Sequence, residues 1–170
     1  RFGGALKGQA AAKLGGEVLK ALVAKSQIEA TEVDEVLMGM VYQGGAGGNP
    51  ARQAAVQGGL PYEVPSMTVN KLCGSGLKAI ALAAQAIRVG EAEVIIAGGM
   101  ENMSSAPYIL PGARWGERLG HGQVEDMMLL DGLWDCFYDC HMGVTAENLA
   151  EDYTISREEQ DQFAARSHEH

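Results

Sequence analysis

Cysteine and positive charge are both scarce in this sequence. The 170 residues include three cysteines, an odd number without disulfide-like spacing. Such a pattern argues against a disulfide framework and favours a reducing compartment, so we expect a cytoplasmic protein. Lysine and arginine together number 13 against 22 aspartate and glutamate residues, which gives a net charge of −9. This excess of negative charge argues against a nucleic-acid partner.

Long apolar runs are also lacking. No uninterrupted apolar run approaches the roughly 20 residues of a membrane span, and no segment has the pattern of a signal peptide, so we expect no membrane partner. The apolar fraction of 46% is typical of a globular protein with a real core. The chain starts at Arg1 without a methionine and stops at His170 within a charged helical pattern. We interpret this as a sequence cut at both ends.

Helical and extended patterns alternate along the first hundred residues. Apolar spacing and capping residues predict helices at residues 10–25, 50–57 and 73–89, and strands at residues 33–42, 66–72 and 94–97. Asn49 and Pro50 suit the cap and first turn of the second helix. The first strand places Val36, Met38 and Met40 on one face. This alternation of helix and strand predicts an α/β fold.

The helix predicted at residues 73–89 is expected to be central. Its apolar side comprises Leu77, Ile80, Ala81, Ala84 and Ile87. Its many alanines indicate close packing on several faces. After residue 104 the pattern weakens, and further helices are expected at residues 144–153 and after Ser156. Glu159 stands where it would complete a capping box with Ser156.

A single cysteine, Cys73, stands between a predicted strand and this helix. The unpaired N–H groups at a helix start favour an anion, and therefore the thiolate form of a cysteine. Gly74 and Gly76 leave room for a substrate carbonyl to approach the backbone. Asn70 is expected to shape the turn through hydrogen bonds from its side chain. The pattern predicts a nucleophilic cysteine whose backbone N–H stabilises an oxyanion, and a buried structural cysteine is the alternative.

Three segments carry a resemblance to a known family. They are Asn70-Lys71-Leu72-Cys73-Gly74-Ser75-Gly76, the preceding Gly47-Gly48-Asn49-Pro50-Ala51-Arg52-Gln53, and the later Ala97-Gly98-Gly99-Met100-Glu101-Asn102-Met103-Ser104. The first resembles the nucleophile motif of the thiolases, and the likeness extends along essentially the whole chain. It is closest to the biosynthetic acetyl-CoA acetyltransferases of that family.

The resemblance implies a particular domain organisation. Residues 1–104 would form a thiolase-like N-terminal α/β domain, in which a mixed sheet surrounds a buried helix that starts at Cys73. The first strand of this domain would precede Arg1. Residues 105–170 would be the beginning of a loop domain that covers the substrate. Thiolases are dimers or tetramers, so we expect a homo-oligomer.

The resemblance also implies a reaction. Two acetyl-CoA molecules would condense to acetoacetyl-CoA and coenzyme A, or undergo the reverse thiolysis, through an acetyl group on Cys73. The coenzyme A thioester would be the substrate, and no further cofactor is implied. His141 and Met142 would contact the substrate, and Leu133 would contact the coenzyme. The family's catalytic histidine and second cysteine lie in a later half, so the 170-residue piece alone is expected to be inactive.

Two other functions remain open from the residues themselves. His141 could act as a base for Cys73, which would make an acyl-thioester hydrolase, although a lone histidine is more often structural. The chain could also be a non-catalytic fragment that acts only by binding. Cys136 and Cys140 are four residues apart, but a zinc site needs four ligands and only His141 is near them in sequence. We therefore expect free thiols and no metal.

Overall fold

The computed structural model describes residues 2–169, which divide into two compact units. Unit 1 runs to Gly132 and unit 2 runs from Leu133. The boundary between the two compact units lies after Gly132, later than the domain boundary expected after residue 104. The expected boundary separates two domains of the family and stays a prediction. Each unit is described below by itself.

Unit 1 is built on three parallel strands. These are β1 (Glu35–Gly39), β2 (Ser66–Val69) and β3 (Ile95–Gly99), in the spatial order β2-β1-β3. Gly39 pairs with both Val69 and Gly99, so the carboxyl ends of all three strands lie at one edge. The α/β prediction is confirmed, but this sheet is parallel throughout, whereas a mixed sheet was expected. Parallel neighbours follow from crossovers through α2 (Pro50–Gln57) and α3 (Ser75–Val89).

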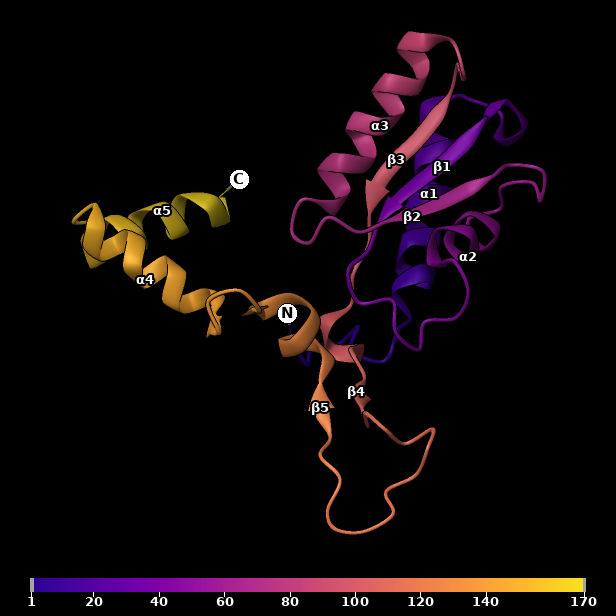
Figure 1. Cartoon of the computed structure of the whole chain (residues 1–170). Helices are drawn as coiled ribbons and strands as arrows, with labels where there is room; N and C mark the ends of the chain where they lie inside the picture. The colour runs from indigo at the N-terminus through magenta and orange to yellow at the C-terminus, as the bar shows by residue number, and fades with distance from the viewer. Residues whose placement is uncertain (1, 170) are drawn as a thin grey trace. The chain divides into compact units, whose positions relative to one another are not determined.

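Helices cover both faces of the sheet, as Figure 1 shows. One face packs against α1 (Ala11–Ser26) and α2, with a core that includes Leu19, Val36, Met38, Ala51 and Ala54. The other face packs against α3 through Leu37, Ala79 and Ala83. Because side chains alternate along a strand, Val36 and Met38 point to one layer and Leu37 to the other. The predicted common face of Val36, Met38 and Met40 is confirmed.

The local signals around α2 define that helix as expected. It begins at Pro50, and the Asn49 side chain accepts a hydrogen bond from the Arg52 N–H. The Asn49 amide also donates to the Ser66 carbonyl, and its oxygen accepts from the Thr68 hydroxyl. The start of α2 is therefore joined to β2, the strand that leads toward Cys73.

The helix α3 differs from its prediction in two respects. It begins at Ser75, with Gly74 as the cap residue, and not at Cys73. The fully buried residues of its inner face are small, with the partly buried Leu82 beside them, and large residues predicted to be buried are exposed: Leu77 is 74% and Ile80 is 52% exposed. In residues 2–169 α3 is therefore covered on one side only, and the expectation of a buried helix, which concerned the whole family domain, stays a prediction. Alanines line the inner face because the helix lies close to the strands.

The composition of this segment also bears on membranes. Residues Leu72–Val89 have a mean hydropathy of 1.3, and judged by length and composition alone they could span a membrane. A single such helix is weak evidence for a span, because core helices of soluble proteins can meet the same criteria. The inner face of α3 packs on the sheet.

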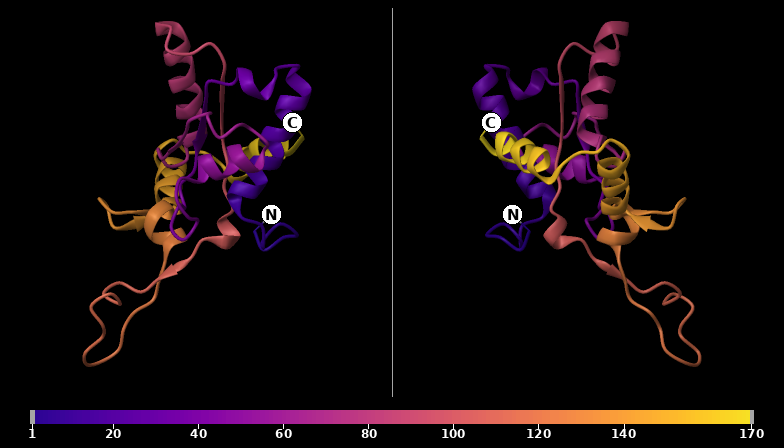
Figure 2. Two further views of the ribbon diagram at one scale, coloured as in Figure 1. Left: turned by 90° about the vertical axis from the view of Figure 1, so that its right-hand side faces the viewer. Right: turned by 90° about the vertical axis from the view of Figure 1, so that its left-hand side faces the viewer.

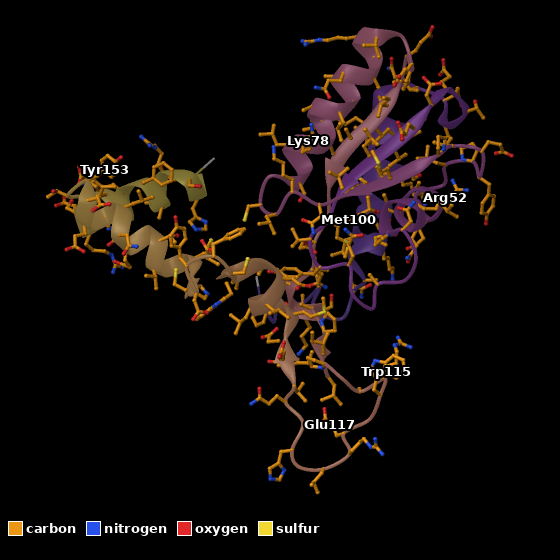
Figure 3. All side chains as sticks on the ribbon, viewed as in Figure 1. Arg52, Lys78, Met100, Trp115, Glu117 and Tyr153 are labelled. Carbon is orange, nitrogen blue, oxygen red and sulfur yellow. The ribbon has the colours of Figure 1, made fainter. Side chains whose placement is uncertain are left out.

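The rest of unit 1 consists of short elements and an extended loop. A 3-10 turn, η1 (Ala30–Glu32), precedes β1, and a second, η2 (Met103–Ser105), follows β3. The strands β4 (Tyr108–Ile109) and β5 (Glu125–Asp126) form an antiparallel pair. Between them residues 111–124 are exposed throughout and extend away from the sheet (Figure 2). Trp115 and Glu117 mark this loop in Figure 3.

Unit 2 contains a small hairpin and two helices. A π-helical turn, η3 (Leu129–Leu133), crosses the unit boundary, and β6 (Trp134–Asp135) pairs antiparallel with β7 (Cys140–His141). The helices are α4 (Met142–Asp152) and α5 (Arg157–Glu169). The capping box predicted at the start of α5 is confirmed, because the Glu159 N–H donates to the Ser156 hydroxyl and the Glu159 carboxylate accepts from the Ser156 N–H.

Candidate active site

Cys73 lies in a turn beyond the carboxyl end of β2. The strand ends at Val69 and α3 begins at Ser75, so the cysteine belongs to neither element. Its thiol is free and the residue is exposed. In open parallel α/β sheets, ligands bind outside the carboxyl ends of the strands. The position of Cys73 therefore makes its thiol accessible to a ligand at the edge where such sites form.

Hydrogen bonds within the turn fix its backbone. The side-chain oxygen of Asn70 accepts a hydrogen bond from the Leu72 N–H at 2.9 Å, which is the contact expected of a turn-shaping asparagine. The Gly74 N–H donates to the Lys71 carbonyl at 3.1 Å, and the Ser75 N–H donates to the Leu72 carbonyl at 3.0 Å. Leu72 has a φ of 48°, in the left-handed region that side chains other than glycine rarely adopt. The residue before the candidate nucleophile is therefore strained.

The start of α3 supplies free backbone donors next to the thiol. No side chain caps this helix. Within residues 2–169 the N–H groups of Cys73, Gly76 and Leu77 have no hydrogen-bond partner. Donors of this kind, together with the helix dipole, stabilise negative charge on a nearby thiolate or oxyanion. The geometry suits attack by sulfur on an acyl group.

Glycines allow α3 to approach the sheet edge closely. A Cβ on Gly39 would come within 2.5 Å of the Gly76 nitrogen, and a Cβ on Gly99 within 3.3 Å of the Gly76 Cα. A side chain at Gly76 would in turn lie 3.7 Å from the backbone of Gly98 and Gly99. Gly76 thus faces the strands in this structure. The sequence suggested that this glycine leaves room for the substrate, but its contacts in the structure are with the backbone of β3.

Tyr42 and Glu101 lie at the same edge and were not singled out from the sequence. The Glu101 carboxylate accepts from the Val41 N–H at 2.7 Å and from the Tyr42 N–H at 3.3 Å. Tyr42 is 7% exposed, and its hydroxyl donates to the Met128 carbonyl at 3.0 Å. Burial raises the pKa of Tyr42, and the nearby charges of Glu101 and Cys73 raise it further. Tyr42 lies three residues after the end of β1 and Glu101 two residues after the end of β3, and this position near a strand end is the signal that could have identified them.

A cavity of about 210 Å³ lies beside Tyr42. Its walls are formed by the start of α1, the loop after β1 and the segment around Asn102, and Cys73 is not among its lining residues. The Asn102 amide donates to the carbonyls of Leu6 and Gln9 and ties down the segment before α1. Because Cys73 does not line the cavity, the cavity is separate from the candidate nucleophile.

The other predicted site residues belong to unit 2. Leu133 ends η3, His141 ends β7 and Met142 begins α4. The His141 Nδ1 accepts from the Gly143 N–H at 2.9 Å and so caps α4. In a neutral imidazole one nitrogen accepts and the other carries the proton, so this bond assigns the proton to Nε2. The structure brings His141 and Met142 together as neighbours at one helix start.

The remaining cysteines lie in the same hairpin of unit 2. Cys136 follows β6 and Cys140 pairs with Asp135, and both are free thiols. Between residues 2 and 169 no group of three or more His, Cys, Asp or Glu side chains could hold a metal ion.

An exposed cysteine between a parallel strand and a helix start defines an α/β protein with a candidate cysteine nucleophile. The family model described as "Thiolase, N-terminal domain" matches residues 1–170. The chain therefore belongs to the thiolase family. It is 60% identical over 166 residues to the acetyl-CoA acetyltransferase of Pseudomonas aeruginosa, and 53% identical over 167 residues to that of Cupriavidus necator.

A third relative is the probable acetyl-CoA acetyltransferase of Escherichia coli, with 55% identity over 166 residues. Each alignment covers 98% of this chain and 42% of the relative. The chain thus spans less than half the length of these relatives.

Proposed function

We propose that the protein containing this chain condenses two acetyl-CoA molecules to acetoacetyl-CoA and coenzyme A, and catalyses the reverse thiolysis. The observation that carries the proposal is the exposed Cys73 thiol beside unpaired N–H groups at the start of α3. Membership of the thiolase family and the names of the relatives support the choice of acyl transfer and of acetyl-CoA. The coenzyme A thioester is a substrate in this proposal, and no other cofactor takes part.

The first half-reaction is an acyl transfer to sulfur. The Cys73 thiolate attacks the carbonyl carbon of acetyl-CoA, a bond from Sγ to carbon forms, and the bond from carbon to the coenzyme sulfur breaks. The coenzyme leaves as a thiolate and takes up a proton. The backbone N–H of Cys73 donates to the oxygen that becomes negative during the attack.

The second half-reaction forms the new carbon–carbon bond. A base removes a proton from the methyl carbon of a second acetyl-CoA, and the carbanion attacks the acetyl group on Cys73. The bond from the acetyl carbon to Sγ breaks and returns the thiolate, so no oxidant or reductant is required. We assign the base and the acid to the part of the longer relatives that this chain does not span. In the same proposal His141 and Met142 contact the substrate, Leu133 contacts the coenzyme, and the protein is a cytoplasmic dimer or tetramer.

The hydrolase alternative receives no support from the histidine geometry. A base that activates Cys73 must present an unprotonated ring nitrogen to the thiol. The His141 Nδ1 already accepts from Gly143, and Nε2 carries the proton in the neutral ring. His141 in this state can donate a hydrogen bond from Nε2 but cannot accept a proton there.

Mass-mapped acetylation of the longest natural form of the protein tests the proposal. With limiting acetyl-CoA we expect acetyl groups on Cys73 and on neither Cys136 nor Cys140, and acetoacetyl-CoA as the product at higher concentration. Cys73→Ala should abolish both signals. Cys136→Ala is the matched control and should retain them. Acetylation of Cys136 or Cys140 in place of Cys73 would contradict the nucleophile assignment, and free acetate as the only product would indicate a hydrolase.

A further inference from the structure

Ser75 is one of the few buried polar residues that the structure describes. It is the first residue of α3 and is 5% exposed, and between residues 2 and 169 the only other buried residue with a polar side-chain group is Tyr42. Buried hydroxyl groups need hydrogen-bond partners, because desolvation without them is costly. The partners of this hydroxyl therefore indicate why a serine is buried here.

Both partners are backbone groups that precede Cys73. The Ser75 Oγ accepts from the Lys71 N–H at 2.8 Å and donates to the Leu72 carbonyl at 2.5 Å. The directions are unambiguous, because an N–H can only donate and a carbonyl can only accept. The side chain of Ser75 thus ties the start of α3 to Lys71 and Leu72, the two residues directly before Cys73.

These bonds act on the strained part of the turn. Leu72 has a φ of 48°, which is unfavourable for a residue with a Cβ and persists only when surrounding contacts hold it. The Ser75 hydroxyl bonds its carbonyl, and the Asn70 side chain bonds its N–H. Without the hydroxyl, the Lys71 N–H would lose its partner, and Leu72 would be held less firmly, by the Ser75 N–H on its carbonyl and by the Asn70 side chain on its N–H. The direction of the Cys73 thiol and N–H would then change.

We propose that Ser75 is a positioning residue for the Cys73 nucleophile. Its hydroxyl holds Lys71 and Leu72 in the conformation that presents the thiol and its neighbouring N–H to an acyl group. Ser75 does not touch the substrate in this role. The inference rests on the proposed function of Cys73, since a positioning residue has meaning only for a residue that reacts.

The test measures acetylation of Cys73 by acetyl-CoA in the longest natural form of the protein. Wild type, Ser75→Ala, Ser75→Thr and Ala83→Gly are compared at a temperature where each is folded by circular dichroism. Ala83 lies in α3 on its packed face, so Ala83→Gly weakens the same helix without touching the turn. A 1 Å misplacement can cost about a hundredfold in rate. We therefore expect the maximal acetylation rate of Ser75→Ala to fall roughly ten- to a hundredfold.

The concentration of acetyl-CoA at half-saturation should change little in Ser75→Ala, because the substituted group does not contact substrate. Ala83→Gly should keep the wild-type rate, and Ser75→Thr should recover part of the loss because it keeps a hydroxyl. A Ser75→Ala rate equal to wild type would overturn the proposal, and so would an equal loss in Ala83→Gly. Absence of acetylation in the wild type would instead refute the proposed function of Cys73.

Amide hydrogen exchange in the wild type keeps the proposal testable if Ser75→Ala does not fold. The Lys71 N–H should be protected as strongly as the Gly74 N–H, because both donate to groups within the same turn. Exchange of Lys71 at the rate of an unstructured amide would show that the hydroxyl does not hold the turn, and would overturn the proposal.

Discussion

Replacement of Gly39 by alanine should displace the start of α3 from the sheet. The added Cβ would lie 2.5 Å from both the Gly76 nitrogen and the Ser75 carbonyl carbon. Ordinary contact begins at about 3.4 Å, so the helix must retreat by roughly 0.9 Å. The clashing atoms belong to the backbone, and no change of side-chain rotamer can relieve them.

The size of the effect follows from this clash. Overpacking of a filled core costs about 1–3 kcal/mol, against a net stability of about 5–15 kcal/mol. At roughly 2–4 °C per kcal/mol for a protein of this size, Gly39→Ala should lower the Tm by roughly 2–12 °C. Because Cys73 is two residues before the displaced helix start, its acetylation should slow as well, by up to about a hundredfold.

Gly98→Ala provides the matched control. Gly98 belongs to the neighbouring strand β3, and its added Cβ would meet only the Met38 sulfur, at an ordinary distance of 3.8 Å. Thermal melting and acetylation rates of the two variants are measured side by side in the longest natural form of the protein. Equal Tm values for Gly39→Ala and Gly98→Ala would refute the close-approach explanation of the glycine at position 39.

Three further perturbations have defined outcomes. Tyr42→Phe removes the hydroxyl that donates to the Met128 carbonyl and should lower the unfolding free energy by about 0.5–1.5 kcal/mol in denaturant titrations, so no change would contradict this bond. The pKa of Asp34 is lowered by backbone N–H donors, so its contribution to stability is complete above about pH 4 and is lost as pH falls through the lower folded value. The Tm of wild type should therefore fall more steeply than that of Asp34→Asn below pH 4, and parallel curves would refute this linkage. Ser156→Ala removes the capping box with Glu159 and should reduce far-UV helical signal, whereas Ser167→Ala near the other end of α5 should not.

Local signals in the sequence predicted the elements whose ends depend on neighbouring residues. Asn49 and Pro50 defined the start of α2, and Ser156 with Glu159 defined the start of α5. The turn-shaping contact of Asn70 is likewise local, because its partner is two residues away. Such features need only the chemistry of a few adjacent residues.

Features that depend on distant residues were missed or inverted. The inner face of α3 was assigned to residues such as Leu77 and Ile80, but the side that packs on the sheet presents Ala79 and Ala83, with Leu82 partly buried beside them. No periodicity within the helix contains that information, since the hydrophobic pattern fits either face. The contact between Tyr42 and Met128 joins residues 86 positions apart and has no local signature either.

The same limit applies to the candidate site. Cys73 was identified from its own neighbours, whereas Glu101 was identified only after β1 and β3 were placed beside each other. The roles of Leu133, His141 and Met142 came from the family resemblance and remain predictions.

Leu72 combines two liabilities that a designer of stable proteins would remove. It is 54% exposed and adopts a φ of 48°, which glycine or asparagine would occupy at lower free energy. A library of random variants screened only for heat resistance should therefore enrich glycine or asparagine at position 72. A parallel screen for acyl transfer would favour whichever residue best preserves the aim of the neighbouring thiol. Divergence between the two screens at this single position would separate what the turn needs to fold from what it needs to react.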